Sequence, residues 1–73
     1  MYYQIAAFKG RNDAIRVANS LNAAGVPNSI IATPRAIVGG CGVSVRYQAQ
    51  YHAVVVDVLD GMDCLTFIGF FAY

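Results

Sequence analysis

The sequence has few of the side chains that usually bind metal ions. It contains no glutamate and a single histidine, His52. The two cysteines, Cys41 and Cys64, are separated by twenty-two residues and form no CxxC pair. A structural zinc ion needs four ligands of these kinds. We therefore expect no metal site and no cofactor in this chain.

Long apolar runs and a secretion signal are also missing. Asp57, Asp60 and Asp63 interrupt the C-terminal third, so no apolar segment reaches the ~18 residues of a membrane-spanning helix. The opening residues 1–4 lack the basic start and the small-residue cleavage site of a signal peptide. These features predict a cytoplasmic protein that does not enter a membrane and whose cysteines are reduced thiols.

Charged residues are scarce, at 12% of the chain, and they are unevenly divided. Residues 1–46 hold all five basic residues against Asp13, a balance of +4, whereas residues 47–73 hold three aspartates and no base, a balance of −3. Five scattered bases with no run among them fall short of a nucleic-acid surface. We expect no nucleic-acid partner.

Apolar residues fill 58% of only 73 positions. This length predicts one domain over residues 1–73, and such a domain buries only about 60% of the surface that its unfolded chain exposes. The apolar excess gathers in residues 65–73, which contain neither a charge nor a proline. Because an unprotected apolar edge strand invites pairing, we expect a homo-oligomer, most simply a two-fold dimer, assembled through this segment.

Hydrophobic spacing predicts the element order β-α-β-β-α-β. The first helix should begin after an N-cap at Asn12 and end at Gly25, because Gly25 favours a left-handed C-terminal turn and Pro27 prevents continuation. In the second helix, three consecutive valines would also tolerate a strand over 53–59. The other predicted elements are strands at 2–8, 29–33, 43–47 and 64–73 and a helix at 48–60.

The last predicted strand is apolar on both faces. Strict alternation puts Leu65, Phe67 and Phe71 on one face and Ile68 and Phe70 on the other. A strand that is apolar on both sides suits a contact between subunits.

Right-handed connections fold this order most simply into an α+β, ferredoxin-like sandwich: an antiparallel four-stranded sheet of order 4-1-3-2 with two helices on one face. The end of strand one, the start of helix one, the loop between strands two and three and the start of strand four then share one edge. This topology places Cys41, Cys64, Lys9, Arg11 and Arg35 at one end of the molecule.

The loop between strands two and three is the unusual part of the sequence, because it reads PRAIVGGCG from position 34 to 42. Gly40 and Gly42 flank Cys41, leave its sulfur unshielded and allow backbone N–H groups to approach an anionic sulfur. Cations such as Lys9 and Arg11, together with a helix N-terminus, would lower the pKa of the thiol. Cys41 is therefore a candidate nucleophile or sulfur carrier, although a small apolar residue in a glycine turn would give the same pattern.

The other polar residues and Cys64 are weaker candidates for a role in the functional site. Arg35 follows a proline and either binds a carboxylate, phosphate or persulfide anion or is a solvated loop charge. Cys64 is more simply structural, since about 10 Å separates strands three and four and a disulfide to Cys41 would need the loop to move. Arg46 should be a charge on the sheet surface, and His52 an exposed helix residue.

The run TPRAIVGGCGVSVR, from Thr33 to Arg46, resembles the Thr-Pro-Arg…Cys-Gly…Arg signature of the selenium/sulfur carrier-like family of small bacterial proteins. The resemblance covers nearly the whole chain. It implies that Cys41 carries sulfur or selenium as a persulfide or selenosulfide, and that Pro34, Arg35, Gly42 and Arg46 are signature positions. The chain departs from the family in its valine-rich second helix and in Cys64, which is not a signature position.

Two functional hypotheses follow. In the first, the chain is an accessory carrier that takes sulfur or selenium from a donor protein on Cys41 and passes it to an acceptor protein, and Arg35 with the first helix N-terminus stabilises the anion. In the second, it is a non-catalytic module that dimerises through strand four and binds a partner or a small anion. A Cys41 thiol pKa well below the usual value of about 8.5 favours the carrier.

Overall fold

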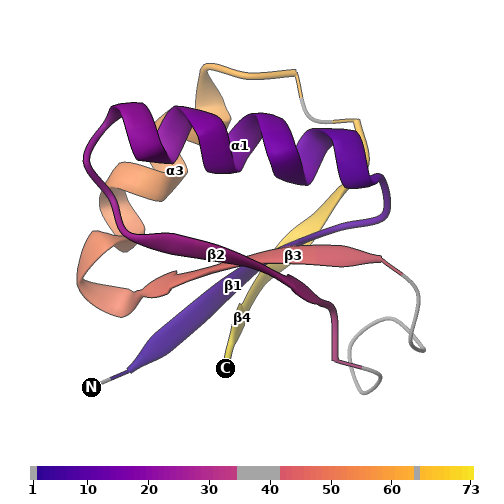
Figure 1. Cartoon of the computed structure of the whole chain (residues 1–73), viewed down its shortest axis with the longest axis horizontal. Helices are drawn as coiled ribbons and strands as arrows, with labels where there is room; N and C mark the ends of the chain where they lie inside the picture. The colour runs from indigo at the N-terminus through magenta and orange to yellow at the C-terminus, as the bar shows by residue number, and fades with distance from the viewer. Residues whose placement is uncertain (1, 35–41, 64) are drawn as a thin grey trace.

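The computed structural model describes residues 2–34, 42–63 and 65–73. In this part of the chain, four antiparallel strands form one sheet of order β2-β3-β1-β4, and α1 and α3 cover the same face of it (Figure 1). This order is the predicted 4-1-3-2 order read from the opposite edge, so the predicted α+β class and strand order are confirmed. The elements are β1 (Tyr3–Phe8), α1 (Arg11–Ala23), β2 (Asn28–Ala32), β3 (Val43–Gln48), the 3₁₀ turn η1 (Ala49–Tyr51), α3 (His52–Asp60) and β4 (Phe67–Ala72).

The hydrophobic core lies between the helices and the sheet. Alternate residues of β1 and β3 face the helices, as the period of two in a strand requires. The helices contribute residues at the three- and four-residue spacing of a buried stripe. The fully or nearly fully buried members are Ala6, Phe8, Val45 and Tyr47 from the sheet and Ala14, Val17, Ala18, Leu21, Val26, Val55 and Leu59 from the helical layer.

Strand β1, which lies between β3 and β4, is buried on both faces from Ile5 to Phe8. Ile5 and Ala7 point away from the helices, yet both are fully buried. Ser44, which pairs with Ala7 across the β1–β3 ladder, is also fully buried. The face of the sheet opposite the helices therefore has its own small buried region around Ala7 and Ser44.

Helix α1 begins two residues earlier than predicted. Gly10 is its N-cap, and Asn12 is the second residue of the helix rather than the cap, so the predicted capping role of Asn12 is wrong. The C-terminus follows the prediction: Gly25 has φ +79°, and the N–H of Val26 donates to the carbonyl of Leu21 at 2.9 Å. This is the Schellman arrangement that a glycine at this position permits.

The segment after β3 is helical. The 3₁₀ turn η1 leads directly into α3, so the alternative strand over 53–59 is wrong, and the α-helix itself begins at His52 rather than at residue 48. Val55 and Leu59, four residues apart, are the buried residues of α3. In this helix, tertiary burial outweighs the low helix propensity of the valine run. In the described part of the chain, no helix has the length and apolar character needed to span a membrane.

Strand β4 differs from the prediction in its start and in its faces. It begins at Phe67, and Leu65 lies before it with 95% of the residue's surface exposed. The pairing with β1 changes register next to Phe67, at a bulge or similar irregularity. Phe67 and Phe70 consequently both pack against the helix-side core, with ring centroids 5.0 Å apart, whereas Phe71 pairs with Ile5. The predicted sharing of a face by Phe67 and Phe71 is wrong, because a bulge breaks strict alternation.

Candidate functional site

Gly42, the described residue that follows Cys41, lies very close to the end of β1. Its φ is +108°, and a Cβ atom at this position would be 2.7 Å from the carbonyl oxygen of Phe8. Both the backbone conformation and the lack of space exclude a side chain. The predicted site residues Arg35, Gly40 and Cys41 lie outside the described residues.

Lys9 and Arg11 flank the junction between β1 and α1, and both side chains are exposed. Phe8, whose carbonyl oxygen approaches Gly42, directly precedes Lys9, so Gly42 lies beside this junction. On the other side of β1, the N–H of Lys9 donates to the carbonyl of Thr66 at 2.9 Å. The starts of α1, β3 and β4 therefore lie at the end of the sheet where β1 ends (Figure 1), and Gly42, Lys9 and Arg11 belong to these junctions.

The start of α1 adds backbone donors to this end of the molecule. The N-cap is Gly10, which has no side chain that could accept hydrogen bonds from the first-turn N–H groups. Such groups carry the positive end of the helix dipole and favour a nearby anion. Two exposed cations and a first turn without a side-chain cap thus follow shortly after Phe8, the residue whose carbonyl Gly42 meets.

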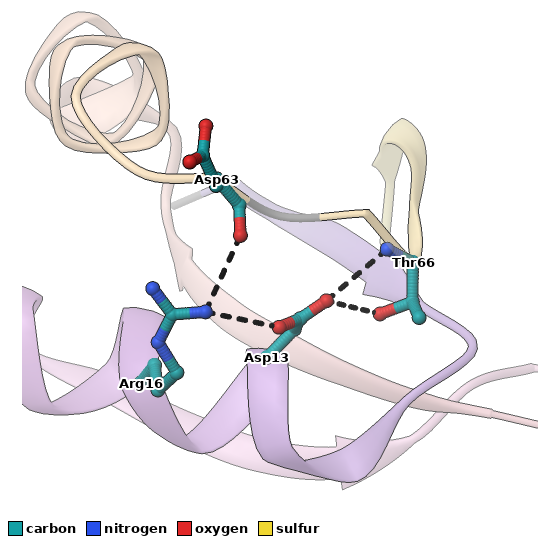
Figure 2. A network of polar contacts seen from close by, with 4 residues as sticks. All are labelled: Asp13, Arg16, Asp63 and Thr66. Carbon is teal, nitrogen blue, oxygen red and sulfur yellow. Dashed lines mark hydrogen bonds and ion pairs between the residues drawn. The ribbon is translucent and has the colours of Figure 1, made fainter.

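Asp13, in the first turn of α1, connects the helix to the segment that precedes β4 (Figure 2). One oxygen of its carboxylate accepts hydrogen bonds from the Thr66 hydroxyl at 2.5 Å and from the Thr66 N–H at 3.1 Å. The other oxygen is 3.3 Å from the guanidinium of Arg16. The hydrogen bonds from Thr66, first from its hydroxyl and then from its N–H, hold the pKa of the Asp13 carboxyl below its usual value.

Arg16 extends the same network to the end of the α3–β4 connection. Its guanidinium donates to the carbonyl oxygen of Asp63 at 3.3 Å, as well as contacting Asp13 (Figure 2). Asp63 directly precedes Cys64, and Thr66 lies two positions after Cys64. Cys64 is outside the described residues, but the chain on both sides of it is hydrogen-bonded to the first half of α1. The sequence analysis missed this network because it connects positions that are about fifty residues apart.

Thr33 and Ser44 form a second polar contact, where the chain leaves β2 and enters β3. Their hydroxyl oxygens are 2.6 Å apart, and both residues are buried. The N–H of Thr33 also donates to the carbonyl of Gly42 at 3.3 Å. We refer to Thr33, Gly42 and Ser44 as the loop clasp, since they join the two ends of the 34–42 segment. The sequence contains one sign of the loop clasp, namely the hydroxyl residues Thr33 and Ser44 on either side of the glycine-rich segment.

Arg46 lies on the sheet surface as predicted, but it is not simply solvated. Its guanidinium carbon is 4.8 Å from the ring centre of Tyr3 and 5.7 Å from that of Tyr73. Contacts of this kind stabilise a protein by roughly 0.5–1 kcal/mol at exposed sites. Arg46 thus connects β3 to residues at both ends of the chain, on the face opposite the helices.

His52 was predicted to be an exposed helix residue, and this prediction is wrong. It is half-buried: its Nδ1 atom is 2.8 Å from the Tyr47 hydroxyl, and its ring meets the Phe70 ring edge-on at 4.8 Å. Burial raises the pKa of Tyr47 to about 12. This cluster lies near the end of β3, whereas Gly42 lies before its start, so the two are at opposite ends of the sheet.

Among residues 2–34, 42–63 and 65–73, no group of three or more histidine, cysteine or acidic side chains is placed to hold a metal ion. Gly42 instead meets the Phe8 carbonyl oxygen, and the residues that follow Phe8 include the exposed cations Lys9 and Arg11. These cations and the first-turn N–H groups of α1, but not the carbonyl, would favour an anion.

Unrelated proteins can share such a sheet, so the family of this chain is taken from a family model and not from the fold. The family model described as "Putative Se/S carrier protein-like" matches residues 2–64. The chain belongs to this family. The match to the Se/S carrier-like family spans the β1–α1 junction, the loop clasp and both cysteines, and it ends before β4. No curated protein and no solved structure matches the chain.

Proposed function

We propose that this Se/S carrier-like protein holds sulfur or selenium on Cys41, as a persulfide or selenosulfide, and passes it to an acceptor protein. The observation that carries the proposal is the family match over residues 2–64, which include the glycine-flanked Cys41. Cys41 directly precedes in sequence Gly42, the residue that meets the end of β1.

The transfer step is an exchange at sulfur. The Cys41 thiolate attacks the terminal sulfur of a donor persulfide, a new Sγ–S bond forms, the S–S bond of the donor breaks, and the donor leaves as a thiolate. The transferred atom keeps its proton, and no electrons are gained or lost overall, so neither an oxidant nor a reductant is consumed. An acceptor thiolate removes the atom in the same way, and selenium in place of the terminal sulfur follows the same balance.

The surroundings of Gly42 support this chemistry by favouring an anion. Lys9 and Arg11 contribute positive charge beside the contact between Gly42 and β1, and the first turn of α1 contributes N–H groups that Gly10 does not cap. Both influences lower a thiol pKa and stabilise the anionic form of a persulfide. In this proposal Gly40 and Gly42 keep side chains away from the sulfur, and Arg35 pairs with the anion.

The experiment is the pH dependence of alkylation of the native protein, followed separately at Cys41 and Cys64 by mass spectrometry of peptides. A carrier thiol should be alkylated much faster than Cys64, with a midpoint well below the usual thiol pKa of about 8.5. Cys41→Ser and Cys64→Ser variants assign the two rates. Equal rates with an ordinary midpoint would contradict the proposal.

The second candidate function is a binding module without thiol chemistry. Strand β4 favours it, because its apolar side chains are only half-buried at an edge of the sheet. The same alkylation experiment separates the two, since a binding module has no need of a depressed Cys41 pKa.

A further inference from the structure

Arg46 is the only charged residue in the four strands, and its charge has no counterion on its own face of the sheet. Its neighbours Val45 and Tyr47 belong to the helix-side core, so alternation turns Arg46 to the opposite face. The four aspartates of the chain lie in α1, in α3 and just after α3. Among the described residues, the ion pair that forms joins Arg16 to Asp13. The guanidinium of Arg46 is therefore not balanced by a carboxylate side chain.

Two aromatic rings hold this guanidinium in place. Its carbon is 4.8 Å from the ring centre of Tyr3 and 5.7 Å from that of Tyr73. The N–H of Tyr73 donates to the carbonyl of Tyr3 at 3.0 Å, so the two residues lie side by side. A ring attracts the positive charge but lacks the lone pairs to which guanidinium N–H groups donate. Arg46 is thus oriented, while its capacity to bind an anion is not used by a carboxylate.

The surroundings of Arg46 are aromatic and apolar. Ile5, which pairs with Arg46 across the β1–β3 ladder, is fully buried. Phe71 pairs with Ile5 from β4 and is half-buried, and Tyr73 is 57% exposed. Aromatic residues and arginine are the residues enriched at interfaces between proteins. We refer to Tyr3, Arg46, Phe71 and Tyr73 as the arginine face.

We infer that the arginine face binds an acidic peptide segment of a partner protein. The guanidinium of Arg46 pairs with a carboxylate of that segment through two parallel hydrogen bonds, and apolar side chains beside the carboxylate cover the rings of Tyr3, Phe71 and Tyr73. The inference rests on the charge and the composition of this face. It does not depend on chemistry at Cys41.

Two other occupants fit the face less well. If the arginine faces of two copies met, neither would supply an acidic side chain, and both guanidinium groups would be buried without an anion. A nucleic-acid strand is held by several phosphate contacts, whereas the strands supply a single cation. A peptide with one carboxylate between apolar side chains matches both the charge and the rings.

The test titrates two peptides into the isotope-labelled full chain and follows its NMR spectrum. The acidic probe is acetyl-Leu-Glu-Leu-Glu-Leu-amide, and its uncharged match has glutamine in place of glutamate. The acidic peptide should shift the side-chain N–H signal of Arg46 and the amide signals of Tyr3 and Tyr73. The glutamine peptide should bind about tenfold more weakly, because hydrogen bonds between charged groups are the stronger ones.

Variants of the chain separate the charge from the fold. Arg46→Gln should weaken binding of the acidic peptide about tenfold, and Arg46→Lys should recover only part of the loss because it lacks the planar fork. Arg16→Gln is the matched control, since it removes the same charge from the helical layer and should leave the affinity unchanged. Circular dichroism checks that each variant is folded.

Tyr73→Ala gives a second test of the arginine face, which serves even if Arg46→Gln does not fold. It removes one ring at an exposed position and keeps the charge. It should weaken binding about threefold, as for the loss of one cation–π contact. Tyr73→Phe keeps the ring and should keep the affinity.

Four results would each overturn the inference: no binding of the acidic peptide at millimolar concentration, equal affinity for the two peptides, equal losses in Arg46→Gln and Arg16→Gln, or tighter binding of oligothymidylate than of the acidic peptide. Shifts confined to Lys9 and Arg11 would also contradict it. An ordinary Cys41 pKa overturns the carrier function and leaves this inference standing, so the two failures are distinguishable.

Discussion

At the scale of single residues, Gly42 and Gly25 allow a direct comparison of two glycines with positive φ. A Cβ on Gly42 would be 2.7 Å from a backbone oxygen, whereas a Cβ on Gly25 would have no atom within 4 Å. Both positions carry the backbone penalty of an L-residue at positive φ, about 1–2 kcal/mol. Only Gly42 carries the steric clash in addition.

We therefore expect Gly42→Ala to lower the free energy of unfolding by more than Gly25→Ala, by roughly 1–3 kcal/mol beyond the control, as for other substitutions that overpack a filled site. Urea unfolding followed by circular dichroism measures both variants under identical conditions. Equal losses in the two variants would show that Gly42 is not packed against β1 as described.

Tyr47 gives a prediction about high pH. Burial raises the pKa of its phenol from 10.0 to about 12, so the folded state favours the neutral form. The stability that this group contributes is therefore complete below pH 10 and is lost as the pH rises from 10 to about 12. The difference in tyrosinate absorbance between the wild type and Tyr47→Phe isolates this group. A midpoint near pH 10 in the folded protein would contradict the burial of Tyr47.

At the scale of elements, the hydrogen bonds of Asp13 join α1 to the segment before β4. Because Thr66 lowers the pKa of Asp13, the folded state favours the carboxylate. The stabilisation is present above the ordinary aspartate value of 3.8 and disappears as the pH falls through the lower pKa of the folded state.

Asp13→Asn should therefore be less stable than the wild type at neutral pH, and the difference should vanish in strong acid. Thermal unfolding at several pH values between 7 and about 2 measures this difference. Asp60→Asn, on the exposed side of α3, is the control for the loss of one negative charge. A difference that stays constant down to the lowest pH would contradict the role of the carboxylate.

Several elements were predictable because their determinants are local. The C-terminus of α1 depends on Gly25 and its neighbours, and the alternation of β3 depends on residues two apart. The bulge at Phe67 was not predictable, because it is a property of the pairing between β4 and β1. The half-buried position of His52 depends on Tyr47 and Phe70 in two different strands, and no spacing rule connects those residues.

The candidate site likewise has one part that the sequence predicts and one part that it does not. The strand order brings Gly42 beside the β1–α1 junction, and the sequence predicts that order from the succession of its elements and right-handed connections. The loop clasp and the Asp13–Thr66 contact were not predicted, because the partners are distant in the chain and neither pair belongs to a known short motif. The Thr33–Ser44 contact follows from the register of β2 and β3, and the Asp13–Thr66 contact follows from the packing of α1 beside the segment before β4. Composition fixes neither of these.

At the scale of the whole molecule, we propose that β4 pairs with its own copy in a two-fold dimer. β4 is an edge strand, its apolar residues are half-buried, and residues 65–73 contain no charge or proline. Phe70 is unsuited to test this proposal, because it packs against Phe67 and His52 within the fold. Ala72, which is exposed on β4, is better placed.

Ala72→Pro should shift the molecular mass toward that of the monomer, since the N–H of Tyr73 points to β1 and alternation turns the N–H of Ala72 toward the open edge. Ala72→Val keeps the N–H and is the control. Light scattering at tens of micromolar measures the mass of each. A wild-type chain that is monomeric under these conditions would contradict the dimer.

The central claim is that Cys41 carries sulfur or selenium, and the most direct test is intact mass spectrometry of the protein purified without reductant. The account predicts a fraction of the chain with one added sulfur or selenium atom, which a thiol reductant removes. The addition should be absent from Cys41→Ser and present in Cys64→Ser. An addition that persists in Cys41→Ser, or a wild-type chain that gains no such atom even after incubation with a low-molecular-weight persulfide, would contradict the claim.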